Sequence, residues 1–273
     1  MVELFILGKK SMKKVSAFSI GIATASILGF VNLPIVKAQI PAVPNTPKNT
    51  QPEGQSETKV LVSEVEIVGA TDNLKEIVSQ AIQIQAGNSI TRAQLQQDIN
   101  AIFATGYFTN VRAVPEDTNL GVRIQFVVEP NPVLRAVKIQ NNQKLPQEVV
   151  NQSFNEQYGQ ILNLKQLQTG VQKLNKWYQD NGYVLAQVID SPKINPDGSV
   201  TLQVAEGVIE DIQVQFVNPE GEETKGKTQP YIITREMQLK PGEIFRRELA
   251  QKDLQRVFGL GIFQDINLNL NPA

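Results

Sequence analysis

The side chains that most often perform covalent chemistry are missing from this chain. Its 273 residues include no Cys and no His, which excludes thiol and imidazole nucleophiles, imidazole bases and zinc sites built on either residue. Residues 259–261 resemble the start of a dinucleotide-binding loop, but Gln264 replaces its third glycine. Glu64 and Glu66 lie in a strand-like segment, where we expect them to face solvent. The sequence therefore predicts no enzyme, no cofactor, no metal and no small-molecule substrate.

The first 38 residues have the composition of an export signal. A lysine-rich stretch (residues 9–14) precedes an apolar run of small residues (15–31), and Val36-Lys37-Ala38 resembles a cleavage site. We expect residues 1–38 to be removed, with an uncleaved membrane anchor as the alternative. Met12 is a second possible start of translation.

Residues 39–58 predict a disordered, Pro-rich linker, because Pro, Asn, Gln and Thr dominate and few apolar residues could be buried. Loss of residues 1–38 removes five Lys and one Glu and changes the net charge of the chain from −1 to −5. A mildly acidic chain without a basic stripe is a poor nucleic-acid ligand, so we expect no nucleic-acid partner.

One order of features then occurs three times. Each copy opens with an alternating apolar strand that ends at a turn residue: Gly69, Asn141 and Asn218. A first helix is expected near 74–84, 146–158 and 231–239, with Asp72 as the N-cap of the first copy. A second helix follows, with Thr91 and Asn163 as N-caps in the first two copies.

Each second helix ends on a glycine: Gly106, Gly182 and Gly261. Glycine tolerates the left-handed conformation that closes a helix, so these residues are interpreted as structural. Aromatic residues stand just before them, at Phe103, Tyr178 and Phe258, and are expected in the core.

Second strands are expected at 108–114, 183–189 and 262–268, and third strands at 122–129 and 200–206. The pattern predicts an α+β fold of tandem βααββ modules at residues 59–130, 131–206 and 207–273. The third module lacks its last strand, so we expect it to be less ordered unless a partner strand completes it.

The repeated unit consists of a strand, two helices that close on an aromatic residue and a glycine, and two further strands. Its repetition behind a signal resembles the POTRA (polypeptide-transport-associated) domain. Three copies behind a Pro-rich segment resemble the branch found in cyanobacteria and in the chloroplast import channel. The resemblance implies a three-stranded mixed sheet in the order first–third–second strand, covered on one face by the helix pair. The second strand is then an edge that can pair with an extended chain.

The resemblance implies that the edge residues bind polypeptide: Phe108, Thr109, Asn110, Val111 and Arg112 in the first module, and Val184, Leu185, Ala186, Gln187 and Val188 in the second. An edge that binds nothing is the alternative. The Pro pair at the first joint predicts a hinge at Pro130, Asn131 and Pro132, because proline restricts φ and keeps the preceding residue extended.

The family further implies a location on the periplasmic side of the outer membrane. The implied partners are unfolded outer-membrane polypeptides, other envelope assembly proteins and an outer-membrane β-barrel, either the chain's own or a partner's. The expected function is polypeptide binding and docking for an outer-membrane translocase or barrel-assembly protein. The alternative is an envelope scaffold with POTRA-like folds, of the division or two-partner secretion type.

Overall fold

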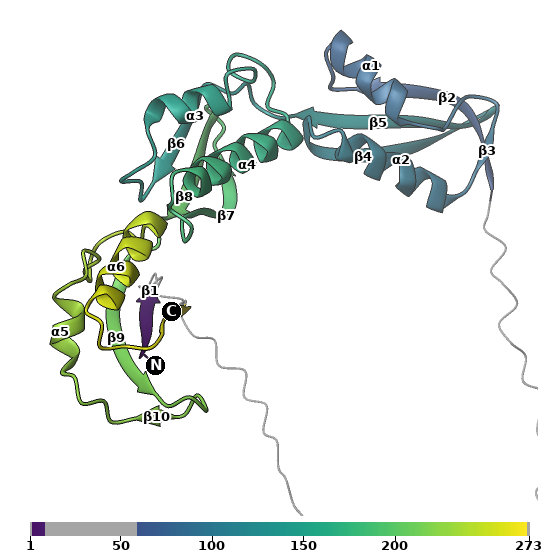
Figure 1. Cartoon of the computed structure of the whole chain (residues 1–273). Coiled ribbons are helices and arrows are strands. Elements are labelled where there is room, and N and C mark those ends of the chain that lie inside the picture. The colour runs from purple at the N-terminus through teal and green to yellow at the C-terminus, as the bar shows by residue number, and fades with distance from the viewer. Residues whose placement is uncertain (1, 9–58, 272–273) are drawn as a thin grey trace, which may run out of the picture. The chain divides into compact units, whose positions relative to one another are not determined.

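The computed structural model describes residues 2–8 and 59–271 (Figure 1). Apart from residues 2–8, the predicted signal and linker lie outside the described residues. The rest forms α+β modules, each with one mixed sheet and two helices, so the predicted fold class is confirmed. None of the helices in the described ranges combines the length and apolar character needed to cross a membrane.

Module 1 contains a four-stranded sheet in the order β3-β2-β5-β4. Its elements are β2 (Val60–Val68), α1 (Asp72–Ala81), β3 (Ser89–Ile90), α2 (Arg92–Ala104), β4 (Phe108–Thr118) and β5 (Gly121–Pro130). β5 runs parallel to β2 and antiparallel to β4. Alternation along β5 buries Ile124, Phe126 and Val128 against both helices, and their neighbours Arg123 and Gln125 form the opposite face.

Module 2 repeats this topology with the order β6-β8-β7. Its elements are β6 (Ala136–Gln140), α3 (Gln147–Ser153), α4 (Leu164–Asp180), β7 (Gln187–Ile194) and β8 (Ser199–Ala205). The central strand β8 is again parallel to the first strand and antiparallel to the second. Gly170 on α4 is required by packing, because a Cβ there would overlap the ring of Phe154.

Module 3 has the sheet order β10-β9-β1-β11. Its elements are β1 (Val2–Gly8), β9 (Ile209–Val217), β10 (Glu223–Thr224), α5 (Pro230–Thr234), α6 (Arg247–Gly259) and β11 (Ile266–Asn271). The middle position, filled by β5 and β8 in the other modules, is taken by the N-terminal strand β1, purple in Figure 1. A partner strand therefore does complete this sheet, and the chain itself supplies it.

The predicted caps of the second helices are confirmed. The Thr91 hydroxyl accepts the N–H of Gln94 in a capping box, and Asn163 Oδ1 accepts two N–H groups of the first turn of α4. The first helix of module 1 is present, but its predicted N-cap is wrong, because Thr71 is the N-cap and Asp72 is the first helical residue. An acidic residue at that position still favours the positive end of the helix dipole.

Candidate polypeptide-binding edge

β4 is a free edge of the module 1 sheet. Its pairs with β5 run from Phe108–Pro130 to Thr118–Gly121, and among the described residues no strand lies on its other side. In an antiparallel pair, alternate residues direct both N–H and C=O away from the partner strand. The five residues predicted to bind in this module lie on this edge: Phe108, Thr109, Asn110, Val111 and Arg112.

The side chains of β4 divide between the two faces of the sheet. Val111 and Ala113 pack against the core beneath the helices, whereas Asn110 and Arg112 are exposed. The strand is longer than predicted and includes Pro115, which has no N–H to donate. The pairing of β4 with β5 also shifts register between Phe108 and Asn110. The part of β4 from Asn110 to Val114 can therefore pair with an added strand without a gap.

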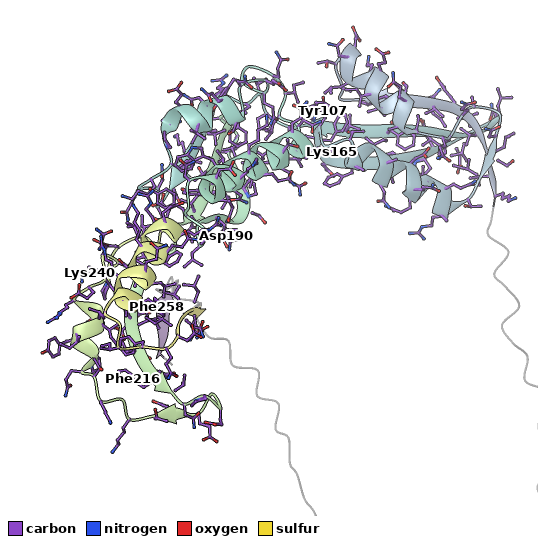
Figure 2. All side chains as sticks on the ribbon, viewed as in Figure 1. Tyr107, Lys165, Asp190, Phe216, Lys240 and Phe258 are labelled. Atoms are coloured by element: carbon purple, nitrogen blue, oxygen red, sulfur yellow. The ribbon has the colours of Figure 1, made fainter. Side chains whose placement is uncertain are left out.

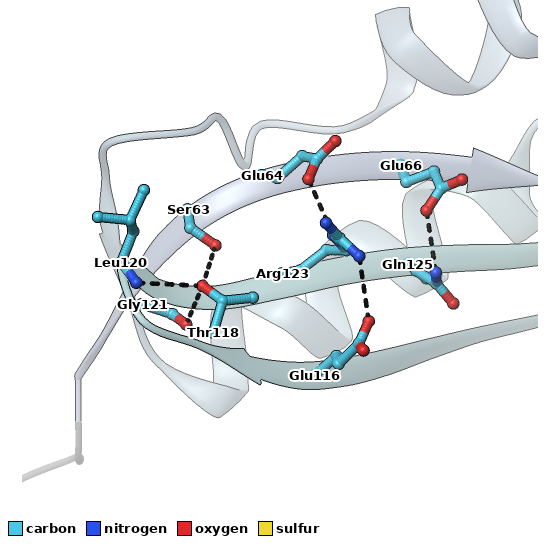
Figure 3. A network of polar contacts seen from close by, with 9 residues as sticks. All are labelled: Ser63, Glu64, Glu66, Glu116, Thr118, Leu120, Gly121, Arg123 and Gln125. Atoms are coloured by element: carbon cyan, nitrogen blue, oxygen red, sulfur yellow. Dashed lines mark hydrogen bonds and ion pairs between the residues drawn. The ribbon is translucent and has the colours of Figure 1, made fainter.

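A polar network joins the far end of β4 to the rest of the sheet (Figure 3). Arg123 Nε on β5 donates to Glu64 Oε2 on β2 at 2.8 Å, and Arg123 Nη1 donates to Glu116 Oε2 on β4 at 3.4 Å. The hydrogen bond and charge of Glu64 raise the pKa of Arg123. Glu66 accepts from Gln125 Nε2 at 2.9 Å beside them. Glu64 and Glu66 face solvent as predicted, and together with Glu116 they brace the three strands on the face away from the helices.

The second predicted edge is shorter than expected. β7 begins at Gln187 rather than Tyr183, so Val184, Leu185 and Ala186 are not strand residues and the predicted segment is wrong there. Val184 and Leu185 instead pack against a buried cluster of module 3, and Ala186 is buried in the module 2 core. Their apolar character serves packing, which an alternating pattern alone does not distinguish from a strand.

Asn175 on α4 shortens the available part of β7 further. Its Oδ1 accepts the backbone N–H of Val188 at 2.8 Å, so that donor is already used within the module. The pairing with β8 then shifts register between Ile189 and Lys193, next to Asp190 at φ 62°. Of the two predicted edges, β4 offers the longer run of regular backbone.

The three structural glycines follow the caps of α2, α4 and α6, with φ of 86° at Gly106, 79° at Gly182 and 67° at Gly261. Their predicted conformation is confirmed. The prediction for the neighbouring aromatics holds only for Tyr178, which is fully buried.

Phe103 and Phe258 are 50% and 54% exposed (Phe258 is labelled in Figure 2). Each phenylalanine precedes its glycine by three residues, whereas Tyr178, Ile102 and Val257 precede theirs by four and are fully buried. One residue rotates the side chain by about 100° around a helix, which moves it out of the core.

Asn131 links modules 1 and 2. It is 4% exposed, and its Nδ2 donates to the Gly106 carbonyl at 2.9 Å and the Leu162 carbonyl at 2.8 Å. Its Oδ1 is buried without a hydrogen-bond partner. The hinge at Pro130, Asn131 and Pro132 stays a prediction, and of these two bonds only the one to Gly106 crosses from module 2 to module 1.

The first turn of α4 docks on the end of α2 at the same joint. The Leu164 N–H donates to the Gly106 carbonyl at 2.8 Å, and Asn163 Nδ2 donates to the Thr105 carbonyl at 3.0 Å. Tyr107 and Lys165, labelled in Figure 2, belong to the two sides of this joint. Asn163 therefore caps its own helix with the oxygen and holds the preceding module with the nitrogen.

Modules 2 and 3 meet in the same way. The Arg247 N–H in the first turn of α6 donates to the Gly182 carbonyl at 2.9 Å. The Glu248 carboxylate lies so close to Gly182 that a Cβ there would overlap it. The Arg246 guanidinium stacks over the Tyr183 ring at 5.5 Å from the centroid. Gly106 and Gly182 thus serve the joints as well as the helices they end, whereas a Cβ on Gly261 would meet nothing within 4 Å.

Sequence reasoning missed the buried carboxylates. Asp98 is 2% exposed and accepts the backbone N–H groups of Gln83 at 3.0 Å and Ile84 at 2.9 Å. Asp253 makes the equivalent bonds in module 3 and is fully buried. Both aspartates stand eight positions before the helix-ending glycine, and that shared register is a signal that could have found them.

Module 2 uses a glutamate instead. Glu206 accepts the N–H groups of Gln143 at 2.9 Å and Lys144 at 2.8 Å, and the Tyr178 hydroxyl donates to Glu206 Oε1 at 2.9 Å. Burial, together with this carboxylate, raises the pKa of Tyr178. The carboxylates of Asp98, Asp253 and Glu206 therefore all accept hydrogen bonds from backbone N–H groups of their own module. Within the described ranges, no group of three or more Asp, Glu, His or Cys could hold a metal ion.

Comparison with known proteins agrees with this geometry. The POTRA family model, described as surface antigen variable number repeat, matches residues 60–131, 132–207 and 212–272. POTRA1-3 of the periplasmic domain of Omp85 from Anabaena is 50% identical, with a TM-score of 0.72, over 80% of this chain and 91% of that one. The N-terminal domain of Omp85 from Thermosynechococcus elongatus is 53% identical, with a TM-score of 0.69, over 77% and 89%.

Curated relatives extend the similarity to chloroplasts. Outer envelope protein 80 of Arabidopsis thaliana is 30% identical over 80% of this chain and 31% of its own length. Protein TOC75-3 of the same plant is 26% identical over 75% of this chain and 30% of its own length. The chain thus spans about a third of the length of these two curated relatives. With three repeats that account for most of its residues, the chain belongs to the POTRA family.

Proposed function

We propose that this chain is the non-enzymatic, polypeptide-binding region of an outer-membrane translocase or barrel-assembly protein, located on the periplasmic side. Three POTRA repeats support this role, as do relatives named for the chloroplast outer envelope and for the periplasmic domain of Omp85. Unfolded outer-membrane polypeptides are the proposed clients, and envelope assembly proteins and an outer-membrane β-barrel the proposed partners.

The observation that carries the proposal is the free edge of β4. An extended client can add a strand beside it and use the outward N–H and C=O groups before Pro115. Each backbone hydrogen bond contributes about 0.5–1.5 kcal/mol net. Four or five such bonds, less the cost of ordering the client, give weak binding that depends little on client sequence. That suits a protein that passes on many different chains.

β7 takes a smaller part in this proposal. Val188 has already given its N–H to Asn175, so a client there finds fewer free donors. Replacing Asn175 by Ala frees that donor and should increase binding at β7 while leaving β4 unchanged. An increase of client binding at β7 alone would show that binding depends on a free backbone N–H group.

A proline scan along β4 tests the proposal. The variants are Asn110→Pro, Val111→Pro, Arg112→Pro and Ala113→Pro. Because N–H groups alternate between β5 and solvent, two variants lose an outward donor and keep their stability. The other two lose a bond to β5 and are destabilised. Binding of an unfolded ten-residue peptide with alternating apolar residues is followed by the broadening of backbone amide signals.

We expect the stable proline variants to lose client binding at β4. Equal binding by every folded variant, or no response of amides 108–114 and 187–189, would rule out strand addition at these edges. That result would favour the alternative, an envelope scaffold that contacts partners through other surfaces. Thermal unfolding of each variant identifies the folded ones and serves as the control.

A further inference from the structure

The first strand and the first helix of module 2 enclose a groove. Its volume is about 540 Å³, within the range of about 300–1,000 Å³ that is usual for small-ligand sites. One side is β6 with the residue before it, and the other is α3 with the turn that follows, all teal in Figure 1. Buried Val137 and half-buried Ala136 and Tyr158 form its floor, and exposed polar side chains form its rim.

Backbone pairing does not account for this groove, because the backbone beside it is already paired at two positions. The Leu134 N–H donates to the Gln160 carbonyl, and the Gly159 N–H donates to the Leu134 carbonyl, both at 2.9 Å. Burial raises the pKa of Tyr158, and a hydrogen bond from the Val137 backbone acts in the opposite direction. A continuous strand therefore cannot be added here as it can beside β4, and a ligand in the groove is held mainly by side chains.

Side-chain amides make up most of the rim. Gln147 and Asn151 stand four residues apart on α3, a rise of about 6 Å, and Asn155 follows after the same interval in the next turn. Gln147 Nε2 donates to Asn151 Oδ1 at 3.0 Å, which leaves the Gln147 oxygen and the Asn151 nitrogen for a ligand. Each amide offers donors and acceptors without carrying a charge.

Arg135 supplies the charge of the groove. It is exposed, and no Asp or Glu is among the residues that line the groove. Hydrogen bonds from Ser199 hold the pKa of the neighbouring Asp197 below its usual value, and the charge of Arg135 is the smallest of the effects that lower it. The Arg135 guanidinium thus stays available to a carboxylate of a ligand.

This lining selects the chemistry of the ligand. An apolar segment would cover the amides without giving them hydrogen-bond partners, which is unfavourable. A cation finds no carboxylate, and a polyanion finds a single arginine. A sugar ring with an acetamido group fits both parts of the groove, because its polar groups can pair with the amides while its C–H face packs on Val137 and the Tyr158 ring.

We propose that the groove between α3 and β6 of module 2 binds an N-acetylated glycan that carries a carboxylate. The amides of Gln147, Asn151 and Asn155 bind its acetamido and hydroxyl groups. Arg135 binds its carboxylate. The site is separate from the β4 edge, so it would attach the chain to a carbohydrate polymer while that edge stays open to clients.

NMR titration of the full chain with disaccharides tests this proposal. The probe is N-acetylglucosamine linked to N-acetylmuramic acid, which has acetamido groups and a carboxylate. Di-N-acetylchitobiose lacks the carboxylate, and maltose lacks both groups. We expect the probe to shift the side-chain amide signals of Gln147, Asn151 and Asn155. Di-N-acetylchitobiose should bind about tenfold more weakly, because it makes no charge-assisted bond, and maltose should cause no shift.

Variants at exposed positions separate the two roles. Arg135→Gln should weaken binding of the probe about tenfold and leave binding of di-N-acetylchitobiose unchanged. Asn151→Ala should weaken binding of both about threefold to tenfold, the loss expected for one or two hydrogen bonds. The matched control is Gln80→Ala, which removes an exposed amide from α1 of module 1 and should change neither affinity. Circular dichroism checks that each variant is folded.

Three results would overturn the proposal. One is the absence of any shift at these amides with the probe. Another is binding of maltose as tight as that of the probe, which removes the roles of the acetamido groups and the carboxylate. The third is a response only to an acetylated Ser-Asn-Gln-Thr peptide, which would make the ligand a polar polypeptide. Client binding is read from amides 110–114, which do not line the groove, so the proposed function and this proposal can fail independently.

Discussion

Replacing Asn131 by Asp tests whether a single amide holds the joint between modules 1 and 2. The substitution keeps the shape of the side chain but replaces its donor nitrogen by an oxygen. In the natural chain Asn131 Nδ2 lies 2.9 Å from the Gly106 carbonyl oxygen and 2.8 Å from that of Leu162, so the new oxygen faces two acceptors. The site is 4% exposed, so water cannot replace the lost bonds.

The magnitude follows from the groups left without partners. The Gly106 carbonyl keeps the N–H of Leu164 at 2.8 Å, so its loss is one hydrogen bond of about 1 kcal/mol. The Leu162 carbonyl loses its Asn131 donor, and leaving this buried acceptor unpaired costs about 1–3 kcal/mol of stability. The new carboxylate of the variant is buried and faces two carbonyl oxygens, which costs further stability. We expect Asn131→Asp to lower the free energy of unfolding by about 3–5 kcal/mol. Asn131→Ala also removes the unpaired Oδ1 and should cost about 1–2 kcal/mol.

Two measurements check this expectation. Trp177 is the one tryptophan of the chain and reports urea unfolding of module 2, while circular dichroism reports all modules. Spin labels at Gln96→Cys and Lys173→Cys, in α2 and α4, give the distance distribution across the joint. Asn131→Asp should separate the two unfolding curves and broaden that distribution, whereas the exposed control Asn110→Asp should change stability by less than about 0.5 kcal/mol. Unchanged curves and distances in Asn131→Asp would refute the reasoning.

Three further predictions concern stability. Gly106→Ala should lower the free energy of unfolding more than Gly261→Ala. Both changes strain a left-handed φ, but only at Gly106 does the new Cβ meet the next module, at 3.0 Å from Asn163 Oδ1. Equal losses of unfolding free energy in denaturant titrations would contradict this. Asp98→Asn should destabilise module 1 by about 1.5–3 kcal/mol, because a charge-assisted bond to a backbone N–H is lost, as measured by hydrogen exchange of the Gln83 and Ile84 amides. The raised pKa of Tyr178 means that its stabilising contribution is complete below the unfolded pKa of about 10 and declines above it by up to about 1.4 kcal/mol per pH unit. The alkaline slope of unfolding free energy should therefore be smaller in Tyr178→Phe, and an unchanged slope would contradict the assignment.

Much of the fold could be predicted because its signals are local. The helix-ending glycines, the caps at Thr91 and Asn163, and the solvent-facing Glu64 depend on neighbours within one element. Such features follow from backbone sterics, short-range hydrogen bonds and the period of apolar residues. The order of strands in modules 1 and 2 came from the family resemblance and agrees with the sheets observed.

The edges were predicted less well, because availability depends on what else packs there. Val184 and Leu185 have the apolar character of a strand but fill the contact with module 3. Val188 lies in a strand, yet its N–H belongs to Asn175, which is distant in the sequence. The predicted site therefore narrows to β4, where the backbone before Pro115 stays free on one side.

By itself, the sequence determined the repeated module, the N-caps of α2 and α4, the glycines that follow the second helices and the exclusion of thiol and imidazole chemistry, since each follows from residue type and short-range spacing. The ends of the first helices were predicted three to five residues too late. Only the tertiary structure decided which glycines also form joints, which carboxylates are buried and which strand fills module 3. Asp98 and Glu206 look like ordinary acidic residues until the fold surrounds them with backbone N–H groups. Val2–Gly8 pairs with β9 and β11 across the length of the chain. No local pattern encodes such a contact, because burial and strand pairing join residues that are remote in sequence.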